Sequence, residues 1–154
     1  MTSLKVNKCL LVTIFLTSGV SNFSTGFALA GYNASAALLE AQMEWDHFNV
    51  VIITAAGIFG LMIGALGTGK IISIGRWRTA LLANLLVILS CIPMMFLSVY
   101  SHIIGRILLG ISGGMNIVAS ANFMAETVPA DIHGAVGTSI NFGIVTGLLL
   151  TTLI

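Results

Sequence analysis

The sequence predicts an all-α membrane protein, because it has too many apolar residues and too few charges for a water-soluble domain. Of its 154 residues, 57% are hydrophobic and 7% are charged, and the mean hydropathy is +1.07, whereas globular chains carry about 25% charged residues. Five stretches without Asp, Glu, Lys or Arg approach or exceed the ~20 residues that a helix needs to cross hydrocarbon. We therefore predict one transmembrane domain over residues 1–154, with spans at about 9–32, 47–68, 79–99, 102–125 and 135–154.

The first span follows Lys5 and Lys8 and ends near Tyr32. A basic start, an apolar run and then small residues are also typical of a cleavable signal peptide, which is the alternative to a retained helix. Beyond Tyr32 the helical spacing continues, Asp46 is suited to cap the second helix, and Trp45 is suited to the membrane interface. We expect the first span to be retained and the second to begin just after Asp46.

The later spans are separated by short connections. Residues 69–78 join the second span to the third, in which Pro93 predicts a kink. Tyr100 and Ser101 are expected to form a tight turn before the fourth span, and Pro129 to turn the chain before the fifth. No connection is long enough to separate two domains.

The charged residues predict an orientation. Most basic residues lie on the side reached after zero or two crossings, namely Lys5, Lys8, Lys70, Arg76 and Arg78, and the acidic residues Glu40, Glu44 and Asp46 lie on the other. The positive-inside rule then predicts a cytoplasmic N-terminus and an outer C-terminus. Arg106 is the exception inside the fourth span, where a lipid-centred Arg costs ~2.5–3.5 kcal/mol on insertion scales, so we expect it to snorkel or to pair with an acid.

Glycines recur at spacings that place them on single helix faces. They are Gly57, Gly60, Gly64 and Gly67 in the second span, Gly110 and Gly114 in the fourth, and Gly143 and Gly147 in the fifth. Small residues at this spacing let two helix backbones approach closely. We therefore expect these glycines to serve helix packing in a tight bundle.

Polar residues also form rows along three spans. The rows are Thr17, Ser18, Ser21, Asn22 and Thr25 in the first, Ser112, Asn116 and Ser120 in the fourth, and Thr138 and Asn141 in the fifth. Hydroxyl and amide groups inside a bilayer need partners. The rows therefore form hydrogen bonds between helices or line a wet cavity, and the sequence leaves both alternatives open.

Several function classes find no support. No carboxylate pair, metal-ligand spacing or nucleophile with a nearby base is present, so we predict no enzyme, cofactor or metal site. A net charge of +1 with scattered basic residues gives no nucleic-acid signature. Cys9 and Cys91 both lie in apolar spans, which argues against a disulfide framework.

A family resemblance is strongest over residues 105–150, which read GRILLGISGGMNIVASANFMAETVPADIHGAVGTSINFGIVTGLLL. This stretch resembles the sugar porters of the major facilitator superfamily, and the matching positions are Gly105, Arg106, Gly110, Gly114, Glu126, Pro129, Gly134, Gly137 and Gly147. Residues 75–82, GRWRTALL, are similar to the family's G-R-R motif, and GYN at 31–33 is similar to its first-helix motif. The resemblance covers nearly the whole chain. It implies that the chain corresponds to the first five helices of the N-terminal half of a sugar porter, arranged as a bundle of three plus two helices.

The resemblance implies site residues and departures from the family pattern. It places an inner-face motif and charge network at Lys70, Gly75, Arg76, Arg78, Glu126 and His133, and substrate-lining positions at Asn22, Asn33, Asn116 and Asn141. Ile72 replaces an acid of the inner-face motif, Trp77 and His133 replace arginines, and Asn141 replaces a glutamine. These changes imply a weakened cytoplasmic gate. Asn33 stands where proton-coupled members carry a carboxylate, which implies facilitated diffusion if a solute is moved.

Two functions follow. Major facilitators place their substrate between two opposed bundles, so the preferred interpretation is a truncated, non-transporting accessory subunit that packs against other membrane protein subunits. The alternative is the N-terminal portion of a facilitative transporter of sugars or other small polar solutes, completed by a second chain or by dimerisation. Under both interpretations the protein contacts the lipid bilayer and binds no nucleic acid. The compartment is not fixed, and only the subunit interpretation suggests the mitochondrial inner membrane.

Overall fold

The computed structural model describes residues 8–43, 46–72, 75–96, 98–128 and 133–153, and within these ranges it is all-helical. Its helices are α1 (Lys8–Met43), α2 (His47–Ile71), α3 (Arg76–Met94), α4 (Val99–Thr127) and α5 (His133–Leu153). The predicted all-α fold with five helices is therefore confirmed. Among the described residues, α2 and α4 have the length and hydropathy of membrane spans, while α3 and α5 contain shorter apolar stretches. Five crossings and their orientation remain predictions.

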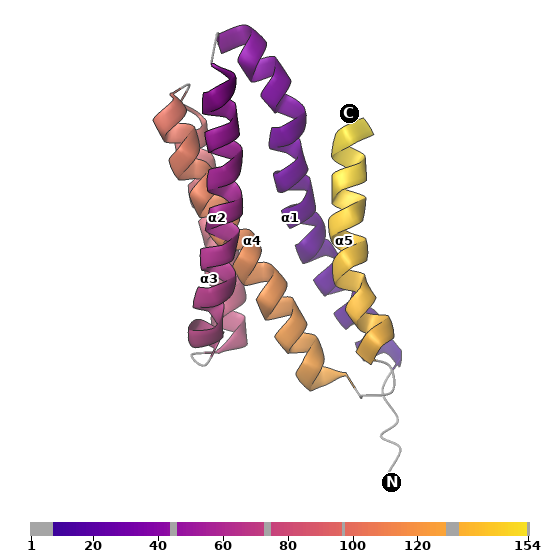
Figure 1. The fold of residues 1–154 in the computed structure, drawn as a ribbon. Coiled ribbons are helices and arrows are strands. Elements are labelled where there is room, and N and C mark those ends of the chain that lie inside the picture. Colours follow the sequence, from indigo (N-terminus) through magenta and orange to yellow (C-terminus); the bar gives the residue numbers. More distant parts are fainter. Residues whose placement is uncertain (1–7, 44–45, 73–74, 97, 129–132, 154) are drawn as a thin grey trace.

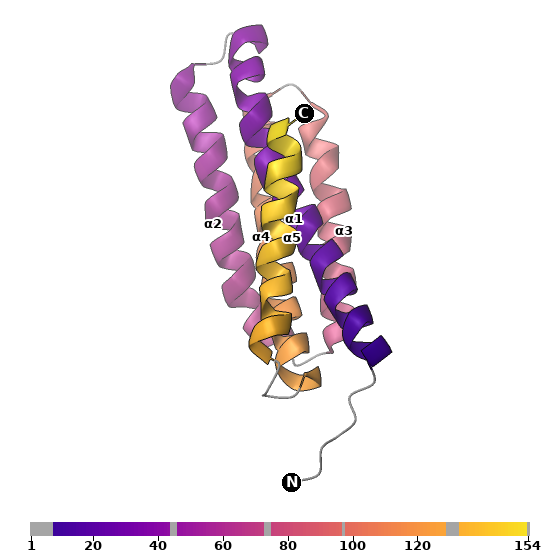
Figure 2. The same cartoon turned by 90° about the vertical axis from the view of Figure 1, so that its right-hand side faces the viewer.

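The helices form two groups that meet at α4. In Figure 1, α2, α3 and α4 pack together on one side, and α1 and α5 lie side by side on the other, with the start of α1 and the end of α5 at opposite ends of the bundle. Figure 2 shows α4 between α2 and α3. The two most extensive helix pairs are α2 with α4 and α1 with α5, and α1 meets α4 over a much smaller area.

Glycines bring α2 and α4 into direct backbone contact. A Cβ atom on Gly60 or Gly64 would press on the carbonyl group of Ile107 or Ile111, and one on Gly110 or Gly114 would press on the α2 backbone. All four positions lack room for any side chain. The small residues therefore set the distance between these helices, as such spacings do in membrane bundles.

The α1–α5 pair is built in the same way. A Cβ atom on Gly26 would meet the backbone of Ile144, and Gly143 and Gly147 lie against the backbone of α1 from Gly19 to Phe27. Gly67 differs, because a Cβ atom there would meet no atom within 4 Å. Gly67 therefore does not share the close backbone contact of Gly60 and Gly64, and the buried residue at this level of α2 is its neighbour Thr68.

Helix boundaries differ from the predictions near Pro93. Helix α3 ends at Met94, one residue after Pro93, so the proline lies in the last turn and does not kink a continuing helix. The backbone N–H groups of Met95 and Phe96 donate to the carbonyls of Ile92 and Pro93, which closes the turn. The chain therefore leaves α3 in a turn at Met95 and Phe96.

The starts of α4 and α2 also bear on the predicted helix boundaries. Tyr100 and Ser101 are not a turn, because α4 already begins at Val99. Asp46 occupies the N-cap position of α2, as predicted, but its side chain makes no capping hydrogen bond. Instead its backbone carbonyl accepts a bond of 2.8 Å from the N–H of Asn49. The predictions for Lys5, Glu44, Trp45 and Pro129 lie outside the described residues.

Candidate functional site

Polar side chains of α1 and α4 face each other along the line where these helices meet, which we name the polar seam. From one end to the other it contains Tyr32, Thr25 and Asn22 of α1 opposite Arg106, Ser112, Gly113 and Ser120 of α4. We include Asn116, which is buried and shares the helix face of Gly113 and Ser120 by its three- and four-residue steps. The two helices run in opposite directions, because Tyr32 meets Arg106 whereas Asn22 meets Ser120. The Asn22 Nδ2 group donates to Ser120 Oγ at 3.0 Å and to the Ser18 carbonyl at 2.8 Å.

The polar seam holds every buried side-chain polar atom that lacks a hydrogen-bond partner within the described part of the chain. These atoms are Asn22 Oδ1, Tyr32 Oη, Arg106 Nε and Nη1, Ser112 Oγ and Asn116 Nδ2. Asn22, Ser112 and Asn116 are only 0%, 1% and 3% exposed. A buried polar group without a partner costs about 1–3 kcal/mol. A molecule with hydroxyl or carboxylate oxygens, or ordered water, would remove that cost.

Arg106 neither snorkels nor pairs with an acid among the described side chains. It is 2% exposed, and its guanidinium carbon lies 4.0 Å from the centre of the Tyr32 ring. This distance is that of a cation–π contact. Tyr32 in turn lies near His102, with ring centres 6.4 Å apart. The negative face of an aromatic ring therefore stands where the sequence predicted a carboxylate.

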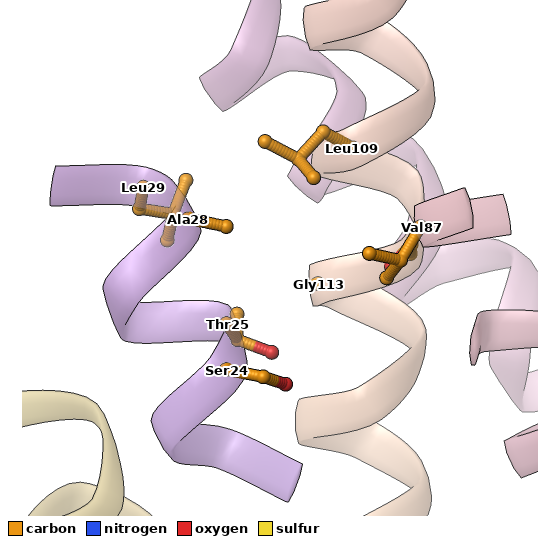
Figure 3. A pocket seen from close by; sticks show the side chains of 8 residues that line it. Ser24, Thr25, Ala28, Leu29, Val87, Leu109 and Gly113 are labelled. Atoms are coloured by element: carbon orange, nitrogen blue, oxygen red, sulfur yellow. The ribbon is translucent and has the colours of Figure 1, made fainter. Parts of the chain in front are cut away.

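A small cavity opens at the middle of the polar seam. Ser24 and Thr25 of α1 point toward Gly113 of α4 across it, and Val87 of α3 closes one side (Figure 3). The cavity volume that is open to the centre of a water molecule is about 10 Å³. This is about the volume that one water needs. Ser24 also borders an open groove of about 470 Å³ between α1 and α3. The polar seam is thus less tightly filled than the glycine-lined pairs.

The α1–α5 pair satisfies its polar groups internally. The hydroxyls of Ser18 and Ser139 form a hydrogen bond of 3.2 Å across it. Thr151 Oγ1 donates to the Gly147 carbonyl at 2.9 Å and approaches the Phe27 carbonyl at 3.5 Å. Hydrogen bonds between helices therefore occur for Ser18 and Asn22 of the polar rows, whereas a wet cavity between α1 and α4 stays a prediction.

Of the four expected lining residues, the structure brings together only two. Asn22 and Asn116 lie in the polar seam, whereas Asn33 and Asn141 are exposed on α1 and α5. The sequence reasoning did not select Tyr32 as a site residue. Its signal was present, because positions 22, 25, 29 and 32 follow the three- and four-residue steps that place side chains on one helix face.

The residues of the inner-face motif lie where α2 joins α3 and where α4 approaches α5 (Figure 1). Gly75 adopts φ 133°, a conformation that residues with a Cβ rarely adopt, and it caps α3 through its carbonyl, which accepts from the Thr79 N–H at 3.0 Å. Lys70, Arg78 and Glu126 are exposed. The side chains of Arg76 and His133 lie outside the described set, so the charge network stays a prediction.

Comparison with known proteins gives one family match, sugar (and other) transporters, over residues 11–154. The chain is 30% identical to a glucose transport protein of Synechocystis over 145 residues, which are 91% of this chain and 31% of that protein. It is 27% identical to solute carrier family 2, facilitated glucose transporter member 12 of Xenopus laevis, covering 86% and 23% of the two chains. It is 31% identical to D-xylose-proton symporter-like 2 of Arabidopsis thaliana, and the match covers 88% of this chain and 29% of that protein. The chain thus spans less than a third of each relative.

Proposed function

This chain belongs to the family of sugar (and other) transporters, and from that premise we propose that it forms one wall of a pathway for sugars or other small polar solutes. The observation that carries the proposal is the polar seam, where six buried polar atoms of α1 and α4 lack partners. A sugar hydroxyl both donates and accepts hydrogen bonds. A polyhydroxylated solute could therefore satisfy donors such as Asn116 Nδ2 and acceptors such as Asn22 Oδ1 together.

The opposite wall is supplied by another bundle, which a second copy of these helices can provide. Transporters of this kind bind solute between two bundles that move against each other about the site. The junction of α1 with α4 suits this role, because a small cavity lies there beside Ser112 and the two helices meet much less extensively than α1 and α5 do. The glycine-lined pairs α2–α4 and α1–α5 then act as stiff units on either side of the polar seam.

The transport mode that we propose is facilitated diffusion. Asn33 follows Tyr32 on α1. Its side-chain amide does not take up and release a proton by ionisation at physiological pH, as a carboxylate can. The relatives include both a facilitated glucose transporter and a D-xylose-proton symporter-like protein. The choice between the two modes therefore rests on Asn33.

The interpretation as a non-transporting accessory subunit has less support than this alternative. The family and the relatives named above are transport proteins. No described feature identifies a partner subunit. We therefore prefer the transporter interpretation to the accessory-subunit interpretation, which the sequence alone had favoured.

Uptake of labelled D-glucose and D-xylose into vesicles that contain the purified chain tests the proposal. We expect saturable uptake that does not change when a proton gradient is imposed or dissipated. Asn116→Ala should abolish it, whereas Asn122→Ala should not, because Asn122 only bonds its own helix through the Val118 carbonyl at 3.0 Å. Absence of saturable uptake, with both variants folded, would overturn the proposal.

A further inference from the structure

The hydroxyl of Ser112 differs from other hydroxyls on these helices. Serine and threonine inside a helix often donate to a carbonyl of the preceding turn, as Thr54, Thr68 and Ser90 do at 3.0, 2.6 and 2.6 Å. Ser112 Oγ has no hydrogen-bond partner, although the residue is only 1% exposed. Ser112 lines the small cavity of the polar seam. A partner for its hydroxyl can therefore lie in that cavity.

The α1 side of the cavity carries two further hydroxyls, those of Ser24 and Thr25 (Figure 3). Ser24 Oγ donates to the Ser21 carbonyl at 2.7 Å, so its proton is used while its oxygen can still accept. Thr25 Oγ1 lies at the long distance of 3.5 Å from the same carbonyl, and it can accept as well. The cavity is therefore bordered by an unpartnered hydroxyl of α4 and two acceptor oxygens of α1.

The size and lining of the cavity suit a single water molecule. The volume open to the centre of a water is about 10 Å³, which accommodates one water and is too small for a sugar ring. A buried water typically makes about three hydrogen bonds, and three hydroxyls border this cavity. The other lining side chains are apolar and offer it none, namely Ala28, Leu29, Val87 and Leu109.

We propose that the cavity binds one ordered water that joins α1 to α4. The water accepts a hydrogen bond from Ser112 Oγ and donates its two protons to Ser24 Oγ and Thr25 Oγ1. It links the two helices between the Asn22–Ser120 hydrogen bond and the contact of Arg106 with Tyr32. The inference goes beyond the proposed function, because this water is part of the bundle whether or not a solute is carried.

The position of this water makes it detectable. Ser112 lies near the middle of α4 (Val99–Thr127), and Thr25 lies near the middle of α1 (Lys8–Met43). At 1.5 Å per residue, Ser112 is about 20 Å from either end of its helix. Water at the membrane surfaces is therefore too far away to contact it directly.

Solid-state NMR of the isotope-labelled chain in lipid bilayers tests the inference through magnetisation transfer from water to protein. We expect transfer to Ser112 Cβ and Thr25 Cβ. Ser139 is the matched control, because it is also 1% exposed but its hydroxyl bonds Ser18 Oγ directly at 3.2 Å. Transfer to Ser139 Cβ should be absent on the same timescale. Equal transfer to both serines, or none to Ser112, would overturn the proposal.

Variants assign the water to the named hydroxyls. Ser112→Ala should abolish the transfer to Thr25 Cβ, and Ser139→Ala should leave it unchanged. Persistence of the transfer in Ser112→Ala would contradict the assignment. If Ser112→Ala does not fold, the transfer measured in the unaltered chain still decides.

A double-variant cycle tests whether the water couples the two helices. Ser112→Ala and Thr25→Val should each lower the ratio of folded to unfolded chain by about 5-fold, the effect of one net hydrogen bond. The double variant should lose about as much as either single variant, because both act through the same water. A loss equal to the product of the two would contradict a shared water.

Two further outcomes separate this inference from the proposed function. Water transfer to Ser112 in a chain without saturable uptake would support the water and overturn transport. Saturable uptake without such transfer would leave the transport proposal standing and overturn the water. Loss of the transfer when D-glucose is added to saturation would mean that solute displaces the water, and it would contradict a water that belongs to the bundle.

Discussion

The two glycine-lined helix pairs and the polar seam join the same helices in opposite ways. Between α2 and α4, and between α1 and α5, glycines bring backbone against backbone with no room for a Cβ atom. Between α1 and α4, polar side chains face one another, a small cavity remains, and buried polar atoms lack partners. Helix α1 takes part in both kinds of contact, and so does α4.

The difference indicates which contacts hold the bundle together and which suit the solute pathway that we propose. Close backbone packing contributes dispersion energy and excludes water, so it favours one fixed distance between helices. A polar interface with unsatisfied atoms costs free energy and is retained where a ligand or water supplies the partners. Stability should therefore depend mostly on the pairs, and solute recognition on the polar seam.

The largest expected loss of stability comes from a methyl group between α2 and α4. Gly110→Ala places a Cβ atom against the Gly57 carbonyl, so the helices must separate, and we expect a loss of about 1–3 kcal/mol. Denaturant unfolding in micelles, followed by tryptophan fluorescence, measures it. Gly67→Ala is the matched control, because a Cβ atom there meets nothing within 4 Å. Equal stability of both variants would contradict the role of the glycines.

A smaller loss is expected at the buried cation of the polar seam. Tyr32→Leu removes the ring that faces Arg106 and should cost about 0.5–2 kcal/mol, the range of cation–π contacts. Tyr32→Phe keeps the ring face, and its stability should stay close to that of the original chain. The same unfolding assay compares them. A loss as large for Tyr32→Phe as for Tyr32→Leu would assign the effect to the hydroxyl instead.

The smallest effect on stability is expected at Asn116, a residue of the solute pathway that we propose. Asn116→Leu removes a buried amide whose Nδ2 has no partner, so the free energy of unfolding should stay the same or rise by about 1 kcal/mol. Solute binding should be lost at the same time. A clear loss of stability would mean that Asn116 holds the bundle together, and the contrast between the two kinds of contact would fail there.

The sequence predicts the helices well because their signals are local. Apolar stretches and the cap at Asp46 place all five, since each helix follows from its own composition. The region near Pro93 is less well predicted, because Met95 and Phe96, which form the turn after α3, include no glycine or charge to indicate it. The continuation of α1 to Met43 likewise exceeds the predicted span, since a helix can extend beyond hydrocarbon.

The site is only partly predictable because it depends on contacts between distant residues. Each polar row is visible in the sequence, but the meeting of Asn22 with Ser120 joins residues that are 98 positions apart. The ring of Tyr32 over Arg106 depends in the same way on how α1 crosses α4. Asn33 and Asn141 match family positions, yet the geometry of this bundle leaves them outside the polar seam.

The most direct measurement compares two serines that are equally buried, one in each kind of contact. Ser112 in the polar seam and Ser139 in the α1–α5 pair are both 1% exposed. Each is replaced by Cys in a chain whose Cys9 and Cys91 are replaced by Ala, and the rate of labelling by a water-soluble thiol reagent is measured in membranes. The predicted result is faster labelling of Ser112→Cys, with protection by bound solute. Equal rates, or faster labelling of Ser139→Cys, would contradict a hydrated, solute-accessible seam between α1 and α4.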